Sequence, residues 1–92
     1  TPELKIEMQE GEPHAFIERL QNEGKFPTAQ STNQIDGVRA EYADGFGLAR
    51  ASNTTPVVVL RFEAQNTEAL HRIKNEFREA VLALRPDLNL PF

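Results

Sequence analysis

Two short runs of alternating apolar and polar residues, separated by an Asp-Gly pair, constrain the fold of this chain more than any other feature. From Val38 to Tyr42 the apolar side chains share one face and the charged ones share the other, in a strand that we expect to open at residues 35–37. Phe46–Arg50 forms the next strand. An Asp-Gly pair suits a type I′ turn, whose central residues both need positive φ. The sequence therefore predicts an antiparallel hairpin centred on Asp44 and Gly45.

Residues outside this hairpin add two strands and a helix. Residues 4–8 alternate apolar and polar side chains, and Val57–Phe62 is apolar on both faces at its start, which is typical of an interior strand. A helix begins near Pro13, which fits the first turn of a helix, and ends at Gly24, where we expect a left-handed residue. Its apolar stripe consists of Ala15, Phe16, Ile17 and Leu20.

The last helix has the clearest periodicity in the chain. Asn66 or Thr67 can cap its first turn, and it ends before Pro86. Glu68 and Arg72 are spaced as a favourable i,i+4 pair. The stripe that we expect to face the core consists of Leu70, Ile73, Phe77, Ala80, Val81 and Leu84.

These elements follow the order β-α-β-β-β-α, which is typical of the α+β class. We therefore expect a two-layer sandwich, in which a four-stranded, mainly antiparallel sheet carries both helices on one face. Residues 25–34 are polar and lack periodicity, so they are predicted to be a loop that Phe26 partly pins. The 92 residues have room for one domain, residues 1–92, with one modest core.

Composition limits the classes of molecule that this chain is expected to bind. The chain has 10 Lys and Arg against 14 Asp and Glu, a net charge of −4, which argues against binding to nucleic acid or to anionic membranes. A nucleic-acid module stays open as an alternative, although no strand combines basic and aromatic residues. The absence of Cys is compatible with the cytoplasm. No apolar run reaches the ~20 residues that span a membrane.

Few residues have the spacing that catalysis or metal binding requires. His14 and His71 have no carboxylate or second His at metal-ligand spacing, so both are interpreted as surface residues. Ser31 and Ser52 lie outside any Gly-x-Ser-x-Gly motif. A domain of this size also has little room for a catalytic triad with its substrate cleft. We therefore predict no catalytic residue and no metal ligand in this chain.

Two glycine-containing segments have simpler structural interpretations. Asp36 and Asp44 are each followed by Gly and are interpreted as turn residues rather than as paired catalytic carboxylates. The segment Gly45–Gly47 lacks the third glycine and the following helix of a dinucleotide-binding loop.

The segment between the last two predicted strands combines residues that suit an oxyanion. Arg50 offers a planar fork of donors, Ser52 and Thr54 offer hydroxyl groups, and Asn53 offers an amide. A tight turn can also direct several backbone N–H groups into one concavity. The alternative is a polar loop in which the Ser, Asn and Thr side chains close local turns, and the residue types alone favour that alternative.

This segment also carries a resemblance to a known family. Asp36–Arg39, the run from Gly45 to Pro56 with its following valine strand, and the terminal helix together resemble the C-terminal domain of the α-D-phosphohexomutases. The nearest branch is that of bacterial bifunctional phosphomannomutase/phosphoglucomutase, and the likeness extends to the ending Pro86–Phe92. The phosphate-binding loop of that family has the form Arg-x-Ser-(Gly or Asn)-Thr-x-Pro, which Arg50, Ser52, Asn53 and Thr54 match. Thr55 stands where many members have Glu, so no role of that Glu is transferred.

The resemblance implies a function for a larger protein. It implies the fourth domain of a cytoplasmic enzyme that interconverts hexose 6-phosphates and hexose 1-phosphates, of mannose and of glucose, through a bisphosphorylated sugar. Mg²⁺, the phosphoserine and the sugar-recognition loop would belong to the other three domains. Hexose 1,6-bisphosphate would be the activator and intermediate of the full enzyme. This chain would clamp the phosphate that is not being transferred, and would have no mutase activity alone.

One alternative from another class stays open beside this resemblance. The chain could be a structural or protein-interaction domain whose polar loop binds nothing. Selective perturbation of residues 50–55 by phosphate distinguishes the two hypotheses.

Overall fold

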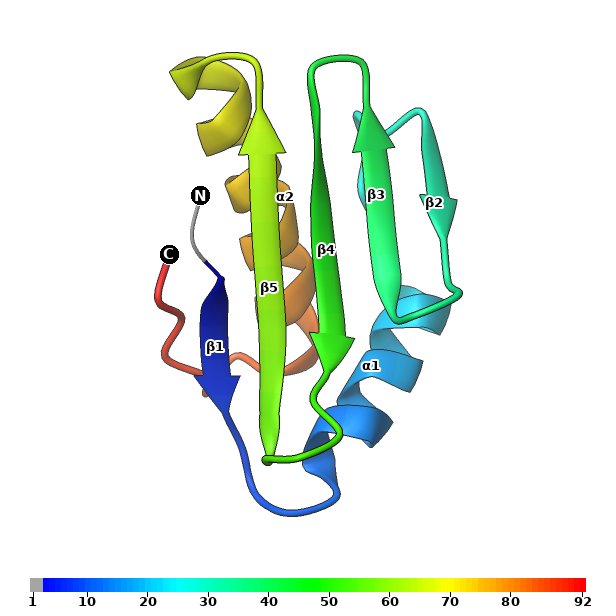
Figure 1. Cartoon of the computed structure of the whole chain (residues 1–92), viewed down its shortest axis with the longest axis vertical. Coiled ribbons are helices and arrows are strands. Elements are labelled where there is room, and N and C mark those ends of the chain that lie inside the picture. Colours follow the sequence, from blue (N-terminus) through cyan, green and yellow to red (C-terminus); the bar gives the residue numbers. More distant parts are fainter. Residues whose placement is uncertain (1–2) are drawn as a thin grey trace.

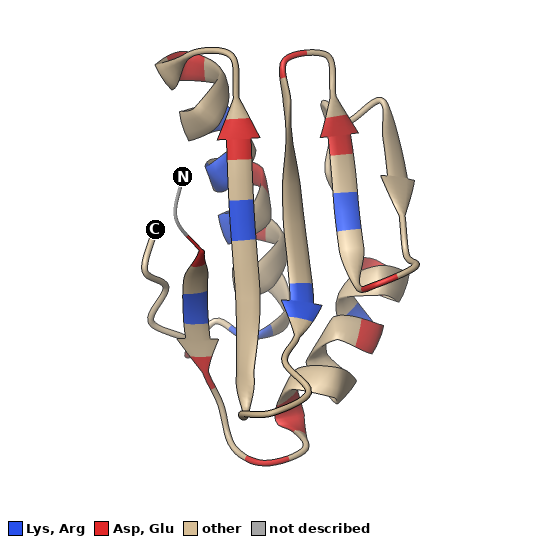
Figure 2. Ribbon diagram, in the orientation of Figure 1, with Lys and Arg blue, Asp and Glu red and all other residues tan. Residues whose placement is uncertain are grey.

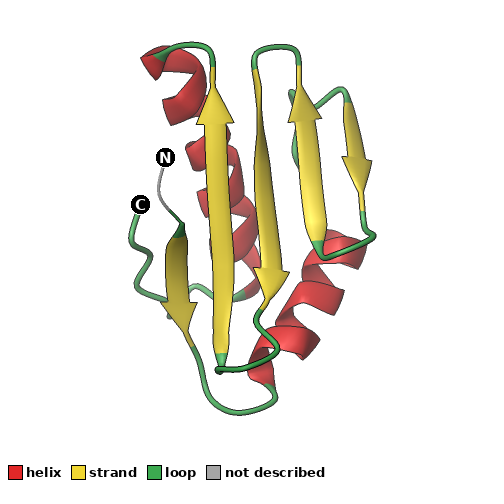
Figure 3. Ribbon diagram, viewed as in Figure 1, coloured by secondary structure: helices red, strands yellow, loops and turns green. Residues whose placement is uncertain are grey.

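A computed structural model describes residues 3–92 as one antiparallel sheet with two helices on one of its faces (Figure 1). The strands are β1 (Leu4–Glu7), β2 (Ser31–Asn33), β3 (Val38–Tyr42), β4 (Gly45–Ala51) and β5 (Val57–Ala64). The helices are α1 (Glu12–Glu23) and α2 (Thr67–Leu84). The sheet order is β1-β5-β4-β3-β2, and every neighbouring pair is antiparallel. The predicted α+β sandwich is confirmed, with five strands instead of four (Figure 3).

The core lies between the sheet and the two helices. The register places Leu4, Leu60, Ala49 and Val38 in one row across four strands. Phe77 of α2 packs edge-on against Phe62 of β5, with ring centroids 5.2 Å apart. The largest fully buried side chains are Phe62, Phe77, Leu20, Leu60, Ile73, Val38, Val58 and Val81.

The first helix differs from the prediction at both ends. Gly11 caps the N-terminus in a left-handed conformation with φ 82°, and Pro13 lies in the first turn as expected. Gly24 is extended, with φ −65° and ψ 141°, so the predicted left-handed stop is wrong. A Cβ on Gly24 would lie 2.5 Å from Leu20 O, so this residue is small because the chain folds back closely. Phe16, Ile17 and Leu20 are buried, whereas Ala15 is exposed.

The second helix begins and ends where the sequence predicts. Asn66 is the N-cap, and its side chain accepts a hydrogen bond from Ala69 N at 2.8 Å. The helix ends at Leu84, two residues before Pro86. Arg72 forms its ion pair with Asp44 of the β3–β4 turn rather than with Glu68. No helix among residues 3–92 combines the length and the apolar character needed to cross a membrane.

The segment 25–34, predicted to be a loop, contains the fifth strand. Ser31–Asn33 pairs with Glu41, Ala40 and Arg39 at the edge of the sheet. All three residues of β2 are exposed, so no alternation of burial marks the strand in the sequence. Phe26 pins the part of this segment that precedes β2, because the centroid of its ring lies 4.6 Å from that of Phe77.

The β3–β4 hairpin is present, but its turn is displaced by one residue. Tyr42 pairs with Gly45, so Ala43 and Asp44 are the central residues. Among residues 3–92 only Gly11 and Gly37 have positive φ, and a type I′ turn at Asp44–Gly45 is therefore wrong. Gly45 is required for space instead, because a Cβ would lie 2.2 Å from Glu63 O of the neighbouring strand.

The first strand of this hairpin, β3, starts later than predicted. β3 begins at Val38, and Ile35 projects into solvent with 83% of its surface exposed. The break occurs at Gly37, whose φ of 130° departs from strand geometry. Residues 34–37 thus form a loop that lies beside the end of β4.

Candidate functional site

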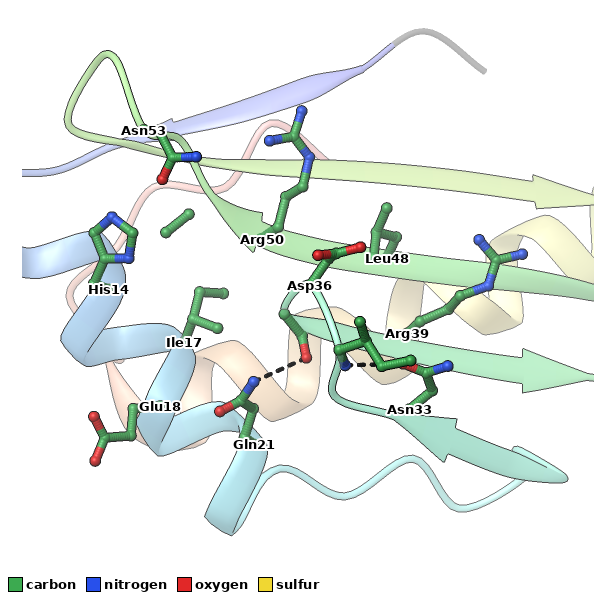
Figure 4. A pocket seen from close by; sticks show the side chains of 13 residues that line it. His14, Ile17, Glu18, Gln21, Asn33, Asp36, Arg39, Leu48, Arg50 and Asn53 are labelled. Carbon is green, nitrogen blue, oxygen red and sulfur yellow. Dashed lines mark hydrogen bonds between the residues drawn. The ribbon is translucent and has the colours of Figure 1, made fainter.

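An open groove of about 920 Å³ lies where α1 faces the end of β4 and the loop before β3 (Figure 4). One wall is formed by α1, and the other by the end of β4 with the turn that follows it. The floor is apolar at Ile17 and Leu48, whereas the rim is polar. Its lining residues are His14, Ile17, Glu18, Gln21, Asn33, Ile35, Asp36, Gly37, Arg39, Leu48, Arg50, Ala51 and Asn53.

The loop before β3 is fixed to α1 by a pair of amide side chains. Gln21 donates through Nε2 to Gly37 O at 3.0 Å and to Gln34 O at 3.3 Å. Gln34 returns a hydrogen bond through Nε2 to Gln21 O at 2.8 Å. These three hydrogen bonds attach the loop before β3 to α1.

Gly37 brings this loop into direct contact with the backbone of β4. A Cβ on Gly37 would lie 2.3 Å from Ala49 O and 3.0 Å from Arg50 Cα. The absence of a side chain therefore permits the approach, and the approach in turn supports the backbone from which Arg50 projects.

Arg50 carries its guanidinium group at the end of β4. Its side chain is 40% exposed, and its ion pair with Glu3 has an N–O distance of 3.9 Å. That distance is at the limit for an ion pair, and exposed pairs of this kind contribute little. The guanidinium fork is therefore accessible for a bidentate contact with an oxyanion.

The turn after β4 gathers several donors around one oxygen. Ser52 Oγ lies 3.3 Å from Thr54 N, 3.4 Å from Thr55 N and 3.3 Å from Thr55 Oγ1. Thr54 Oγ1 lies 3.3 Å from the same oxygen. These contacts are exposed and longer than the usual 2.9–3.0 Å of a hydrogen bond to N–H. The oxygen on which these donors converge is the Ser52 hydroxyl itself, so Ser52 closes the turn locally, as the alternative interpretation of this loop expects.

The backbone of β4 supplies one further donor. Ser52 donates its N–H to Val57 O at 3.0 Å, on the side of β5. In an antiparallel sheet, successive N–H groups of a strand point to opposite sides. The N–H of Ala51 is therefore directed to the side of β3, whose pairing with β4 ends at Val38 and Ala49. Ala51 lines the groove at this place.

The structure places the four residues singled out in the sequence at two positions, the groove and the turn beside it. Arg50 and Asn53 line the groove. Ser52 and Thr54 lie in the adjoining turn and contact each other. Their assignment as phosphate ligands stays a prediction, to which the accessible guanidinium and the exposed donors of the turn give a geometric basis.

The opposite wall was not predicted from the sequence. His14, Glu18 and Gln21 recur on one face of α1 and line the groove. Their spacing of three and four residues is the only sequence signal, and it equally describes any solvated helix face. Asp36, interpreted from the sequence as a turn residue, is also part of the lining.

Positions of Lys or Arg and of Asp or Glu are interspersed along the strands of the sheet (Figure 2). Among residues 3–92 no group of three or more His, Asp or Glu side chains is arranged to hold a metal ion. The groove lining itself carries the guanidinium groups of Arg39 and Arg50 and the carboxylates of Glu18 and Asp36.

Comparison with known proteins identifies the family. Residues 3–80 match the model of the family described as phosphoglucomutase/phosphomannomutase, C-terminal domain. This chain belongs to that family. It is 49% identical over its whole length to a phosphomannomutase/phosphoglucomutase of Pseudomonas putida, and 50% identical over 99% of its length to a phosphoglucomutase of Neisseria meningitidis serogroup B.

A solved structure agrees with the family and with the fold. The chain superimposes with a TM-score of 0.90 on a phosphoglucomutase/phosphomannomutase family protein from Burkholderia thailandensis, to which it is 52% identical. All of this chain is covered, but only 19% of that protein is. The chain likewise spans 20% of the length of the Pseudomonas and Neisseria relatives.

Proposed function

We propose that this phosphohexomutase domain is a phosphate clamp, within an enzyme that interconverts hexose 6-phosphates and hexose 1-phosphates of glucose and mannose. The observation that carries the proposal is the accessible Arg50 guanidinium beside a turn whose exposed N–H groups have only long contacts, to Ser52 Oγ. Arg50 would be the principal charge partner of the phosphate. Ser52 and Thr54 would donate hydroxyl hydrogen bonds, and Asn53 would donate an amide hydrogen bond.

The geometry supports recognition of phosphate rather than of a particular sugar. Phosphate oxygens would replace Ser52 Oγ as the acceptors of the donors in this turn. One loop would hold the 6-phosphate in one half-reaction and the 1-phosphate in the other. Closure of this domain over the substrate would exclude water and position the phosphate that reacts. The other three domains of the enzyme would supply the transferable phosphoryl group and the contacts to the sugar.

Mg²⁺ and the bisphosphorylated intermediate belong to the proposal for the full enzyme, not to this chain. The groove residues do not fit a divalent cation, because they include no cluster of carboxylates. No step of the reaction is therefore assigned to a metal at this site. A cytoplasmic location, where hexose phosphates are metabolised, is part of the same proposal.

An amide NMR titration of the 92-residue chain tests the clamp directly. Two or three charge-assisted hydrogen bonds of about 1.5–3 kcal/mol, reduced by the cost of association, correspond to a dissociation constant of about a millimolar. Glucose 1-phosphate and glucose 6-phosphate should both shift the amides of residues 50–55, and glucose should not. Arg50→Ala should abolish the shifts.

Arg61→Ala is the matched control, because Arg61 lies on the neighbouring strand and pairs with Glu63 at 3.3 Å, outside the groove lining. It should leave the shifts intact. If neither sugar phosphate shifts residues 50–55, the loop does not bind phosphate in this chain, and the hypothesis of a structural or protein-interaction domain is favoured instead.

A further inference from the structure

We propose that His14 is a proton-dependent ligand of the anion groove, so that this domain binds oxyanions more tightly when the imidazole carries a proton. The inference rests on the proposed function, because it concerns the same groove. It adds a residue from α1 that the phosphate-loop sequence does not include, and a regulation by pH.

His14 lies opposite the phosphate loop. It is the third residue of α1, is exposed to solvent and lines the groove together with Arg50 and Asn53. Figure 4 shows its imidazole pointing toward the turn that carries Asn53. Among residues 3–92, no hydrogen bond or ion pair engages the His14 side chain. Its ring nitrogens are therefore available to an anion held between the two walls.

The charge of the groove depends on this imidazole. The lining includes two carboxylates, of Glu18 and Asp36, and two guanidinium groups, of Arg39 and Arg50. With a neutral imidazole these formal charges cancel. Arg39 is further engaged by Glu41, at 2.5 Å. Protonation of His14 therefore adds one positive charge to the groove, which favours an oxyanion.

The charged groups around His14 come from every element that borders the groove. Glu18 lies one turn further along α1, Asp36 projects from the loop before β3, Arg39 lies on β3 and Arg50 on β4. Glu12, two residues before His14, is occupied by Gln9 N at 2.8 Å and by Arg85 at 3.5 Å. Among these side-chain types, only imidazole ordinarily changes its charge between pH 5 and 8.

Sulfate is the appropriate probe, because it mimics phosphate in shape and remains a dianion throughout this pH range. The shifts of residues 50–55 are titrated with sodium sulfate at pH 5.5 and pH 8 at constant ionic strength. The wild-type chain is compared with His14→Gln, which keeps a polar side chain, and with His71→Gln. His71 is a matched control because it is exposed on α2 and is not part of the groove lining.

We expect sulfate to bind about fivefold more tightly at pH 5.5 than at pH 8, the effect of one exposed charge pair of about 1 kcal/mol. His14→Gln should remove the difference, and His71→Gln should retain it. At pH 5.5 sulfate should also shift the imidazole resonances of His14 and leave those of His71 unchanged.

The outcomes separate this inference from the proposed function. Equal affinity at the two pH values, or a difference that survives in His14→Gln, overturns the role of His14 and leaves the clamp intact. Absence of any shift at residues 50–55 at either pH overturns both.

Discussion

At the scale of single residues, the candidate site depends on a glycine as much as on its polar side chains. Gly37 has φ 130° and packs against Ala49 O and Arg50 Cα. A side chain at this position has to adopt an unfavourable backbone conformation, and it has to displace the strand that carries Arg50. Position 37 therefore couples the stability of the fold to the placement of the guanidinium.

Gly37→Ala is expected to destabilise the chain by about 3 kcal/mol, the sum of backbone strain and overpacking. Gly11→Ala is the matched control, because Gly11 also has positive φ, 82°, but has no atom within 4 Å of the added Cβ. It should cost only the strain, about 1–2 kcal/mol. Urea unfolding of the two variants measures the difference. Equal losses would mean that the close approach to β4 contributes nothing.

At the scale of elements, the β3–β4 turn is clasped to α2 by a bidentate ion pair. Arg72 donates to the two carboxylate oxygens of Asp44 at 2.9 and 2.5 Å. The hydrogen bonds from Arg72 lower the pKa of Asp44, and the charge of Arg72 adds to this effect. The clasp also reaches residues 24–30, because Arg72 donates to Thr28 Oγ1 at 3.2 Å.

This clasp makes part of the stability dependent on pH. A carboxyl whose pKa is lowered in the folded state stabilises that state above the unfolded-state value near 4, and the contribution is lost as pH falls through the folded-state value. Asp44→Asn should therefore be less stable than the wild type at pH 7, with a smaller difference at pH 2.5. Urea unfolding of the variant and the wild type at both pH values measures the difference in their free energies of unfolding. A difference that is the same at both would exclude the ion pair as its cause.

The elements that the sequence predicted are those with a periodic pattern of burial. α2 and the interior strand β5 have long apolar stripes. α2 has the predicted bounds, and β5 begins at the predicted Val57 but continues beyond the predicted Phe62 to Ala64. β2 was missed because three exposed polar residues join the sheet edge through backbone hydrogen bonds alone. The hairpin turn was displaced because Gly45 is required by the proximity of Glu63 O rather than by positive φ.

At the scale of the whole molecule, the candidate site forms between a loop of contiguous residues and α1, a helix that lies far from this loop in the sequence. The residue types of the loop, Arg50 and Ser52–Thr54, were visible in the sequence because they are contiguous. The facing wall, with His14 and Gln21, could not be predicted because it depends on how α1 packs against the face of the sheet, chiefly against β4. Only the packed molecule juxtaposes the two walls.

In the full-length enzyme, loss of the proposed clamp should lower kcat/KM by a factor that does not depend on the sugar. Loss of a charge-assisted contact of about 1.5–3 kcal/mol predicts that Arg50→Ala lowers kcat/KM by about tenfold to a hundredfold. The factor should be the same for glucose 1-phosphate and mannose 1-phosphate, because in the proposed clamp the guanidinium would contact phosphate oxygens and no sugar hydroxyl. Arg61→Ala should leave both values unchanged.

Steady-state kinetics with the two sugar phosphates measures this factor, and circular dichroism checks that each variant is folded. Factors that differ by more than tenfold between the sugars would mean that Arg50 recognises the sugar. An unchanged kcat/KM for both would remove Arg50 from the clamp altogether. Equal losses for both would locate recognition of sugar identity outside Arg50, because a group that binds only phosphate lowers both transition-state free energies by the same amount.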